Sequence, residues 1–297
     1  MESHSQLANR LELSLPDLEE MAATASQRYH VYPLIMGNKK RWIEAPDAEL
    51  KAVQRKLLDR VLYRIAPTKW AHGFVRGRSI VTGAQEHVGK QWVVNLDIKN
   101  FFPSVTRRQV VQCIGPLCEE SSEIELIANL VTRRGRLPQG APTSPHLANL
   151  VVRRMDNRLA GLADANAWSY TRYADDMSFS GDAAPQAIVK SASKIVLASG
   201  FELSGHKTQI RGQHQRQCVT GLTVNERVAI PKTQRRLLRS MLHNLEVNSK
   251  SVEPGDSRLD VIAGYLSFLA MVCPEQFEAA RRQLLEIMRP RLGVAVG

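Results

Sequence analysis

The chain has 297 residues, of which 43% are hydrophobic, so it is long enough and apolar enough to form a globular protein with a real core. Its formal net charge of +11 favours a polyanionic partner, most often nucleic acid, although charge alone leaves an unspecialised basic surface open. The longest apolar stretch, residues 261–273, is too short to span a bilayer. Because the N-terminus also lacks the regions of a signal peptide, we expect a cytoplasmic protein without a membrane partner.

The cysteines and histidines give no sign of a metal site. The four cysteines, Cys113, Cys118, Cys218 and Cys273, have no C-x-x-C spacing, which favours reduced, partly buried thiols over a zinc site or a disulfide framework. The eight histidines show no metal-ligand spacing either.

The first half of the chain predicts a helix, a hairpin, a second helix and a buried strand. Ser14 can cap a helix, and residues 31–43 are typical of a hairpin with Gly37-Asn38 at its turn. Helical spacing follows Pro46. Residues 92–98 form an almost continuous apolar run, which predicts a central strand.

The second half is richer in helices. Ser144 is expected to cap a helix with Pro145 in its first turn, and residues 187–198 predict another helix that ends at Gly200. Residues 261–273 predict a buried helix in a basic, helical last third. A soft boundary is expected near Asn225, where strands give way to helices.

Three carboxylates stand at the ends of two predicted strands. Asp97 ends the apolar strand, and Asp175 and Asp176 lie between two alternating segments, which places them at the tip of a hairpin. Clustered carboxylates of this kind hold the two magnesium ions of phosphoryl-transfer enzymes. The alternative is an acidic turn that binds no metal.

Several sequence blocks resemble those of the reverse transcriptases, and within them the bacterial retron type. They occur in the order of that family: residues 41–46, the block around Asp97, residues 137–145, residues 173–176, and Gly200-Phe201 with Lys207-Thr208. Two further blocks, Val219-Thr220-Gly221 and Gly83-Ala84-Gln85-Glu86-His87, are similar to retron blocks, although Gly83 replaces the usual asparagine.

The resemblance implies an α+β fold, a right-hand polymerase with fingers, an antiparallel-sheet palm and a helical thumb. The expected parts are N-terminal helices and fingers at 1–88, a palm at 89–224 with a fingers insertion at about 105–140, and a basic thumb at 225–297.

The resemblance also assigns roles at the carboxylates. It implies that Asp97 and Asp175 bind two Mg²⁺ ions, that Asp176 completes the cluster, and that the backbone carbonyl of Ile98 also reaches a metal. Lys207 matches a family lysine and is expected to donate a proton to pyrophosphate, or else to be an ordinary cationic loop residue.

Residues for the incoming deoxynucleoside triphosphate (dNTP) follow in the same way. Phe102 matches the residue that excludes a ribose 2′-hydroxyl, although it and Phe101 also fit a simple core pair. Gln139 is expected to approach the nucleotide from its Pro-Gln-Gly loop. Arg41 is the candidate triphosphate clamp, assisted by Lys40 unless that lysine is only solvated.

Two segments are expected to bind nucleic acid. The resemblance links Val219, Thr220 and Gly221 to recognition of the cognate RNA. Four cations further on have i, i+3, i+4, i+7 spacing, which places them on one face of a helix; they are Lys232, Arg235, Arg236 and Arg239. Such a face suits the backbone of a nucleic-acid duplex. The alternative is a face that is only solvated.

The implied reaction is template-directed DNA synthesis on RNA. Retron resemblance further implies that the protein binds a cognate noncoding RNA and starts DNA synthesis from the 2′-hydroxyl of an internal guanosine. The product would be a branched RNA–DNA molecule called msDNA. The resemblance also implies a role in defence against phages, together with a separate effector protein. The alternatives are a free-standing reverse transcriptase related to group II introns or another bacterial defence class, or a scaffold that mainly binds msDNA and restrains a toxin.

Overall fold

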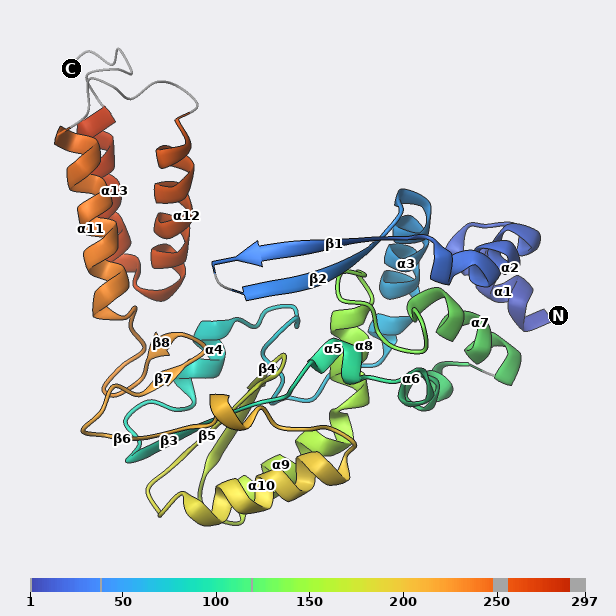
Figure 1. Cartoon of the computed structure of the whole chain (residues 1–297), viewed down its shortest axis with the longest axis horizontal. Coiled ribbons are helices and arrows are strands. Elements are labelled where there is room, and N and C mark those ends of the chain that lie inside the picture. The colour runs from blue at the N-terminus through green and yellow to red at the C-terminus, as the bar shows by residue number, and fades with distance from the viewer. Residues whose placement is uncertain (1, 38, 119, 248–255, 289–297) are drawn as a thin grey trace.

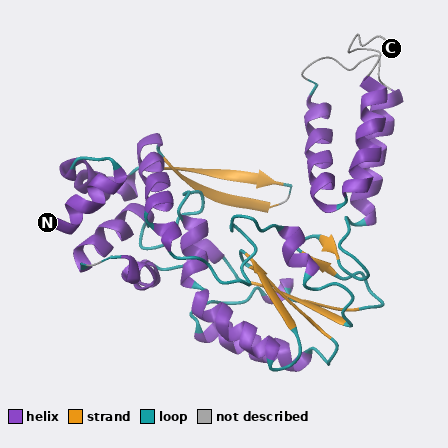
Figure 2. Cartoon of the chain, turned by 180° about the vertical axis from the view of Figure 1, so that it is seen from behind, coloured by secondary structure: helices purple, strands orange, loops and turns teal. Residues whose placement is uncertain are grey.

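The computed structural model describes residues 2–37, 39–118, 120–247 and 256–288. These residues form a mixed α+β protein (Figure 1). The N-terminal helices lie at one end of the molecule, an antiparallel sheet lies in the middle, and the C-terminal helices stand at the other end (Figure 2). The predicted α+β fold with an antiparallel sheet is confirmed.

The N-terminal part begins with short helices and a long two-stranded ribbon. Its elements are α1 (Glu2–Leu11), α2 (Leu15–Thr24), β1 (Tyr29–Met36), β2 (Lys39–Pro46) and α3 (Ala48–Arg60). The Ser14 hydroxyl accepts the Asp17 backbone N–H at 3.2 Å, so the expected cap is confirmed. The ribbon is the predicted hairpin, with Gly37 at a φ of +58°, while Asn38 lies outside the described residues. Figure 1 shows the ribbon reaching from α3 toward the C-terminal helices.

The central sheet has the strand order β4-β5-β3-β6, and all neighbours are antiparallel. Its strands are β3 (Trp92–Asp97), β4 (Ser169–Tyr173), β5 (Asp176–Gly181) and β6 (Gln209–Gly212). The predicted apolar strand is therefore interior, between β5 and β6.

The two faces of this sheet differ in chemistry because side chains alternate along each strand. One face packs its apolar side chains into the main core, among them Val94, Leu96 and Phe179. The opposite face carries a run of polar side chains: Asn95, Asp97, Asp176, Ser178 and Ser180. The phase of this alternation directs Asp97 and Asp176 away from the core.

Helices cover the apolar face and continue into the N-terminal part. In Figure 1, α9 (Arg153–Asp164) and α10 (Gln186–Ala198) lie along the sheet. Gly200 follows α10 with a φ of +84°. One hydrophobic cluster runs from Leu7 in α1 to Phe201, so the N-terminal helices and the sheet share a core. The remaining α-helices between residues 80 and 151 are α4 (Ile80–Gln85), α5 (Phe101–Ser104), α6 (Arg107–Ile114), α7 (Ser121–Val131) and α8 (Ser144–Val151).

The expected cap of α8 is wrong. Thr143, and not Ser144, occupies the cap position, and its side chain makes no capping hydrogen bond. The Ser144 hydroxyl instead donates to the Pro138 carbonyl oxygen at 2.8 Å. A contact with the preceding loop therefore takes the place of the local cap, while Pro145 lies in the first turn as predicted.

The C-terminal helices have a separate core. A short hairpin, β7 (Cys218–Val219) with β8 (Leu222–Thr223), leads to α11 (Lys232–Val247), α12 (Ser257–Val272) and α13 (Pro274–Met288). A second hydrophobic cluster joins these helices to the hairpin, α4 and Val93. The segment 261–273 is helical as predicted but only one of its sides is buried, since Val261 and Met271 are exposed.

The structure also bears on membrane spans and on the cysteines. None of the helices in the described residues is long and apolar enough to cross a membrane. All four cysteines are free and half-buried, as predicted.

Candidate active site

The three acidic residues meet at one edge of the central sheet. Asp97 ends β3 and lies directly opposite Asp176, the first residue of β5. Ala174 and Asp175 form the turn between β4 and β5, and Ala174 takes a left-handed φ of +55°. The Ile98 N–H donates to the Asp175 carbonyl oxygen at 3.0 Å, which fixes this turn against β3. The predicted hairpin tip therefore brings both segments together.

Two of these carboxyl groups, those of Asp175 and Asp176, have raised pKa values because they are buried beside other carboxylates. Burial, followed by the charges of Asp175 and Asp97, raises the pKa of Asp176 to about 6. Burial, assisted by the charge of Asp97, also raises the pKa of Asp175. Like charges held this close favour either a proton or a cation among them.

The donor set suits divalent metal ions, which prefer hard carboxylate and carbonyl oxygens. In this conformation, however, no group of three or more His, Cys, Asp or Glu side chains within the described residues converges closely enough to hold a metal. The Lys207 Nζ atom instead lies 2.7 Å from each carboxylate oxygen of Asp97. A fully formed metal site therefore needs Lys207 to leave Asp97 and the carboxylates to turn toward one another.

The acidic cluster separates two cavities. The first has a volume of about 780 Å³ and is lined by Asp97 and Asp175, and the second, of about 620 Å³, is lined by Asp97 and Asp176. His206 and Lys207 border both cavities. Two substrates bound in these cavities would both reach the carboxylate of Asp97.

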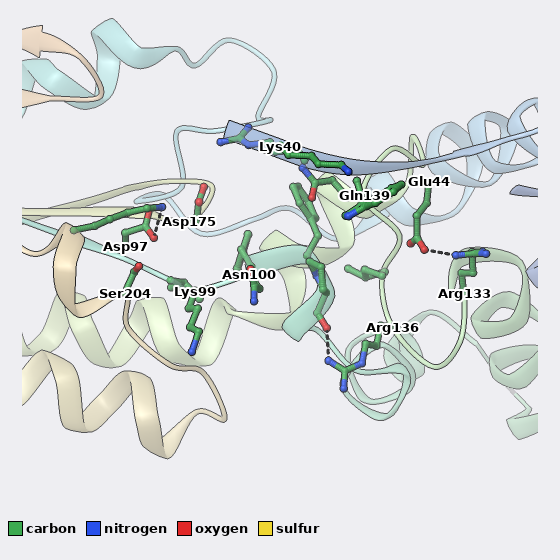
Figure 3. A pocket seen from close by; sticks show the side chains of 18 of the residues that line it. Lys40, Glu44, Asp97, Lys99, Asn100, Arg133, Arg136, Gln139, Asp175 and Ser204 are labelled. Atoms are coloured by element: carbon green, nitrogen blue, oxygen red, sulfur yellow. Dashed lines mark hydrogen bonds and ion pairs between the residues drawn. The ribbon is translucent and has the colours of Figure 1, made fainter. Parts of the chain in front are cut away.

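Cations dominate the first cavity. Figure 3 shows Asp97 and Asp175 on one side of it and the ion pair of Glu44 with Arg133 on the other. Seven lysines and arginines line it against three acids, a balance that favours a polyphosphate ligand. Besides Lys207, the cations are Lys40, Arg41, Lys99, Arg133, Arg134 and Arg136, and the acids are Glu44, Asp97 and Asp175.

Sequence reasoning missed the arginine turn at residues 133–136. Arg133 pairs with Arg136 across the turn, in which Arg134 and Gly135 have φ values of +49° and +74°. Arg136 donates to the Pro103 carbonyl oxygen at 2.9 Å, so the turn is attached to α5. The Arg-Arg-Gly-Arg sequence, with a glycine suited to positive φ, was the signal for this turn.

The residues expected to bind a nucleotide line the first cavity together. Phe101 is buried in the core, whereas Phe102 is half-buried. The carbonyl oxygen of Gln139 accepts the Glu44 N–H at 2.8 Å, which joins its loop to β2. Lys40 is exposed, with Nζ 4.5 Å from the centre of the Trp42 ring.

The second cavity has Thr220 and Gly221 of one retron-like block on its border, together with Ile80 of α4. Thr220 and Gly221 form the two-residue turn between β7 and β8, with φ values of +47° and +84°. Val219 itself is buried, so its side chain packs in the second core. The Thr220 hydroxyl donates to the carbonyl oxygen of Ile80 in α4 at 3.3 Å. Segments about 140 residues apart thus form one wall.

His87 attaches the block at residues 83–87 to the sheet. Its ring is fully buried, with Nδ1 2.7 Å from the Ser180 hydroxyl and Nε2 2.7 Å from the Thr171 hydroxyl. Burial lowers the pKa of His87 to about 3, so the ring is neutral. This block therefore ties α4 to the polar sides of β4 and β5.

A buried ion pair supports the turn from the opposite face. Arg172 and Asp156 are fully buried and form two hydrogen bonds, of 2.8 and 2.7 Å. The Arg172 guanidinium also donates to the Asn149 side chain at 2.9 Å and to the Ala174 carbonyl oxygen at 3.0 Å. Arg172 thereby holds the left-handed turn that presents Asp175.

The predicted cationic stripe lies on α11, away from the acidic cluster. Lys232, Arg236 and Arg239 are exposed, while Arg235 is half-buried. The helical spacing is confirmed, and contact with nucleic acid stays a prediction.

Comparison with known proteins places the chain in a family. Residues 36–225 match the family model described as "Reverse transcriptase (RNA-dependent DNA polymerase)". The chain is 30% identical to the retron Ec86 reverse transcriptase of Escherichia coli, in an alignment that covers 92% of this chain and 85% of that one. The chain belongs to the retron reverse transcriptases. The resemblance read from its motifs is thus confirmed.

Other relatives are longer than this chain. It is 40% identical to the retron Mx65 reverse transcriptase of Myxococcus xanthus over 82% of its length, and 37% identical to the retron Mx162 reverse transcriptase of the same organism over 84%. The chain spans 61% and 58% of those two retron proteins. Among solved structures, a foamy viral protease–reverse transcriptase is similar with a TM-score of 0.46 and 15% identity over 82% of this chain and 36% of that one.

Proposed function

We propose that this retron reverse transcriptase copies part of a cognate noncoding RNA into DNA by attack of a primer hydroxyl on the α-phosphate of a dNTP. The observation that carries the proposal is the position of the carboxylates. Asp97 borders two cavities, one lined by cations suited to a triphosphate and the other by the retron-like turn at Thr220 and Gly221. Such an arrangement serves a reaction between two bound substrates.

In this proposal Asp97, Asp175 and Asp176, with the carbonyl oxygen of Ile98, hold two Mg²⁺ ions. The ions would activate the attacking hydroxyl and stabilise the leaving pyrophosphate. Lys207 is proposed to exchange its contact with Asp97 for one with the pyrophosphate, to which it would donate a proton. Its ammonium group lies 2.7 Å from Asp97, and Lys207 also lines the cavity proposed for the triphosphate, which supports this exchange.

The first cavity is proposed to bind the incoming nucleotide. Arg41 and Lys40 would hold the triphosphate, Gln139 would contact the nucleotide, and Phe102 would exclude a 2′-hydroxyl. Arg134 joins them as an exposed guanidinium on a turn whose shape is fixed by its neighbours. A guanidinium binds phosphate oxygens with a planar fork, which suits this task.

The second cavity is proposed to hold the priming nucleotide of the RNA, with Val219 supporting the turn of Thr220 and Gly221. The cations Lys232, Arg235, Arg236 and Arg239 of α11 would contact the backbone of the product duplex. In this proposal residues 1–88 act as N-terminal helices and fingers, 89–224 as palm and 225–297 as thumb.

The finer function follows the retron family. We infer priming from an internal 2′-hydroxyl, a branched msDNA product, and a defence complex with a separate effector protein. Family membership supports these inferences, and the retron-like turn at Thr220 and Gly221 borders the second cavity.

The direct test is the nucleic acid that co-purifies with the protein expressed from its native locus. A denaturing gel should show a discrete short DNA whose mobility changes after RNase treatment, because RNA and DNA are covalently joined. Heterogeneous RNA without attached DNA, from a locus shown to be transcribed, would contradict the proposal.

A matched variant separates synthesis from binding. The double variant Asp175→Asn and Asp176→Asn keeps the shape of the turn but loses two carboxylates, so it should retain the RNA and lack the DNA. If this variant still protects cells from phages, catalysis is not required for defence.

A further inference from the structure

Phe74 is an aromatic residue in an unusual backbone conformation next to the acidic cluster. Its φ is +61°, a region that bulky side chains rarely adopt. Its side chain is also 46% exposed, so burial of the ring does not account for the conformation. Backbone outliers of this kind persist only where the surroundings impose them, and they concentrate at functional sites.

The surroundings impose this conformation through the loop that carries Phe74. The Arg78 guanidinium donates to the carbonyl oxygens of Thr68, Lys69 and Ala71. The carbonyl oxygen of Gly73 accepts the Asn149 side-chain amide at 2.9 Å. These contacts close the loop from both sides.

The loop is also packed against the catalytic turn. His72 N–H donates to the Arg172 carbonyl oxygen at 2.7 Å, beside strand β4. A Cβ atom on Gly73 would lie only 2.7 Å from the Ala174 backbone nitrogen, so the loop touches the turn before Asp175. The residue that follows Gly73 is consequently held at a fixed distance from the acidic cluster.

In this place the Phe74 ring contacts two residues of the site. Its centre lies 6.1 Å from that of Phe102, tilted by 51°, and 6.2 Å from that of Tyr173, tilted by 40°. Phe101 lies on another side of Phe102, at 5.6 Å. Phe102 is half-buried and packs against the main core on one side, and these two aromatic neighbours restrict the orientation of its ring further.

We propose that Phe74 is a positioning residue that holds the ring of Phe102 and thereby determines how strongly the protein selects deoxyribonucleotides over ribonucleotides. The proposal rests on the proposed function, in which Phe102 excludes the 2′-hydroxyl. Without Phe74, the Phe102 ring would be free to move aside, and a ribose would enter the space that it occupies.

The test measures kcat/KM for a dNTP and for the matching ribonucleotide, with the protein bound to its co-expressed RNA. Phe74→Gly removes the ring and fits the positive φ, so the loop keeps its conformation. This variant should lower the ratio of the two kcat/KM values by about tenfold, the scale of a displaced apolar wall. Phe74→Leu, which keeps an apolar side chain, should lower it less.

Control variants separate the role of Phe74 from the role of Phe102. Tyr63→Ala removes another partly exposed ring, which contacts His146 and Arg76, and should leave the ratio unchanged. Phe102→Ala should lower the ratio by at least as much as Phe74→Gly. Because Phe74 acts through Phe102, combining Phe74→Gly with Phe102→Ala should lower it no further than Phe102→Ala alone.

Each result decides between the proposals. If Phe102→Ala lowers the ratio and neither Phe74 variant does, Phe74 has no positioning role, while the role of Phe102 stands. If Phe102→Ala leaves the ratio unchanged, the proposed sugar exclusion by Phe102 fails, and the role of Phe74 fails with it. A further loss in the double variant would show an independent contact and overturn the positioning role.

Discussion

Replacing Asp156 by alanine should strongly destabilise this protein, because it leaves the Arg172 guanidinium charged and buried without its partner. Both side chains have no exposed surface, and Asp156 accepts two hydrogen bonds from Arg172. Asp156 also accepts the Tyr170 and Thr68 hydroxyls at 2.8 Å each. Removal of one partner of a buried ion pair costs about 3–5 kcal/mol.

Chemical denaturation of the Asp156→Ala variant measures this cost as a fall in the free energy of unfolding. A loss of that size corresponds to a fall in melting temperature on the order of 10 °C. Thr68→Val is the matched control, since it removes a single hydrogen bond to the same carboxylate and should cost about 1 kcal/mol. Should Asp156→Ala cost no more than Thr68→Val, the charge of Arg172 would not depend on Asp156, and the reasoning would be refuted.

Further predictions concern pH and salt. Burial lowers the pKa of His87 from 6.5 to about 3, so between these pH values only the unfolded chain binds a proton on this residue. The free energy of unfolding should therefore fall on acidification by up to about 1.4 kcal/mol per pH unit. Denaturation of His87→Gln across this range should show a shallower dependence of the free energy of unfolding on pH. Burial and nearby carboxylates raise the pKa of Asp176 from 3.8 to about 6, so the folded chain keeps a proton on this residue to a higher pH than the unfolded chain does. The chelator-treated protein should therefore lose stability as the pH rises from about 4 to about 6. Asp176→Asn should reduce this loss, and an unchanged dependence of stability on pH would contradict the raised pKa of Asp176. Replacing Arg236 and Arg239 by glutamine should reduce the slope of log affinity for an RNA–DNA duplex against log salt by about two units, whereas replacing the two lysines of α10 should not.

Local sequence signals were enough to predict the elements that carry the acidic cluster. Alternation on both sides of Asp175 and Asp176 marked two strands and a tight connection, and the apolar run before Asp97 marked an interior strand. Antiparallel pairing of those strands then brings the three residues to one edge. Resemblance to a family supplied the roles, which no local pattern contains.

Contacts between distant segments could not be predicted. Arg172 stands in an alternating segment in which an arginine ordinarily faces solvent, and its partner Asp156 lies on a helix 16 residues earlier. The same limit explains Ser144, whose local pattern favours a cap but whose hydroxyl bonds the Pro138 carbonyl. In each case the competing partner is defined only once the chain has folded.

The wall built from α4 and the β7–β8 hairpin has a consequence for protein engineering. Its two pieces are distant in the chain but meet through the Thr220 hydroxyl and the Ile80 carbonyl, and both pack in the second hydrophobic cluster. A chimaera that takes only the hairpin from another family member would place a foreign turn against a native helix. Chimaeras between relatives should therefore exchange residues 79–88 and 217–224 together, because the two segments form one structural unit.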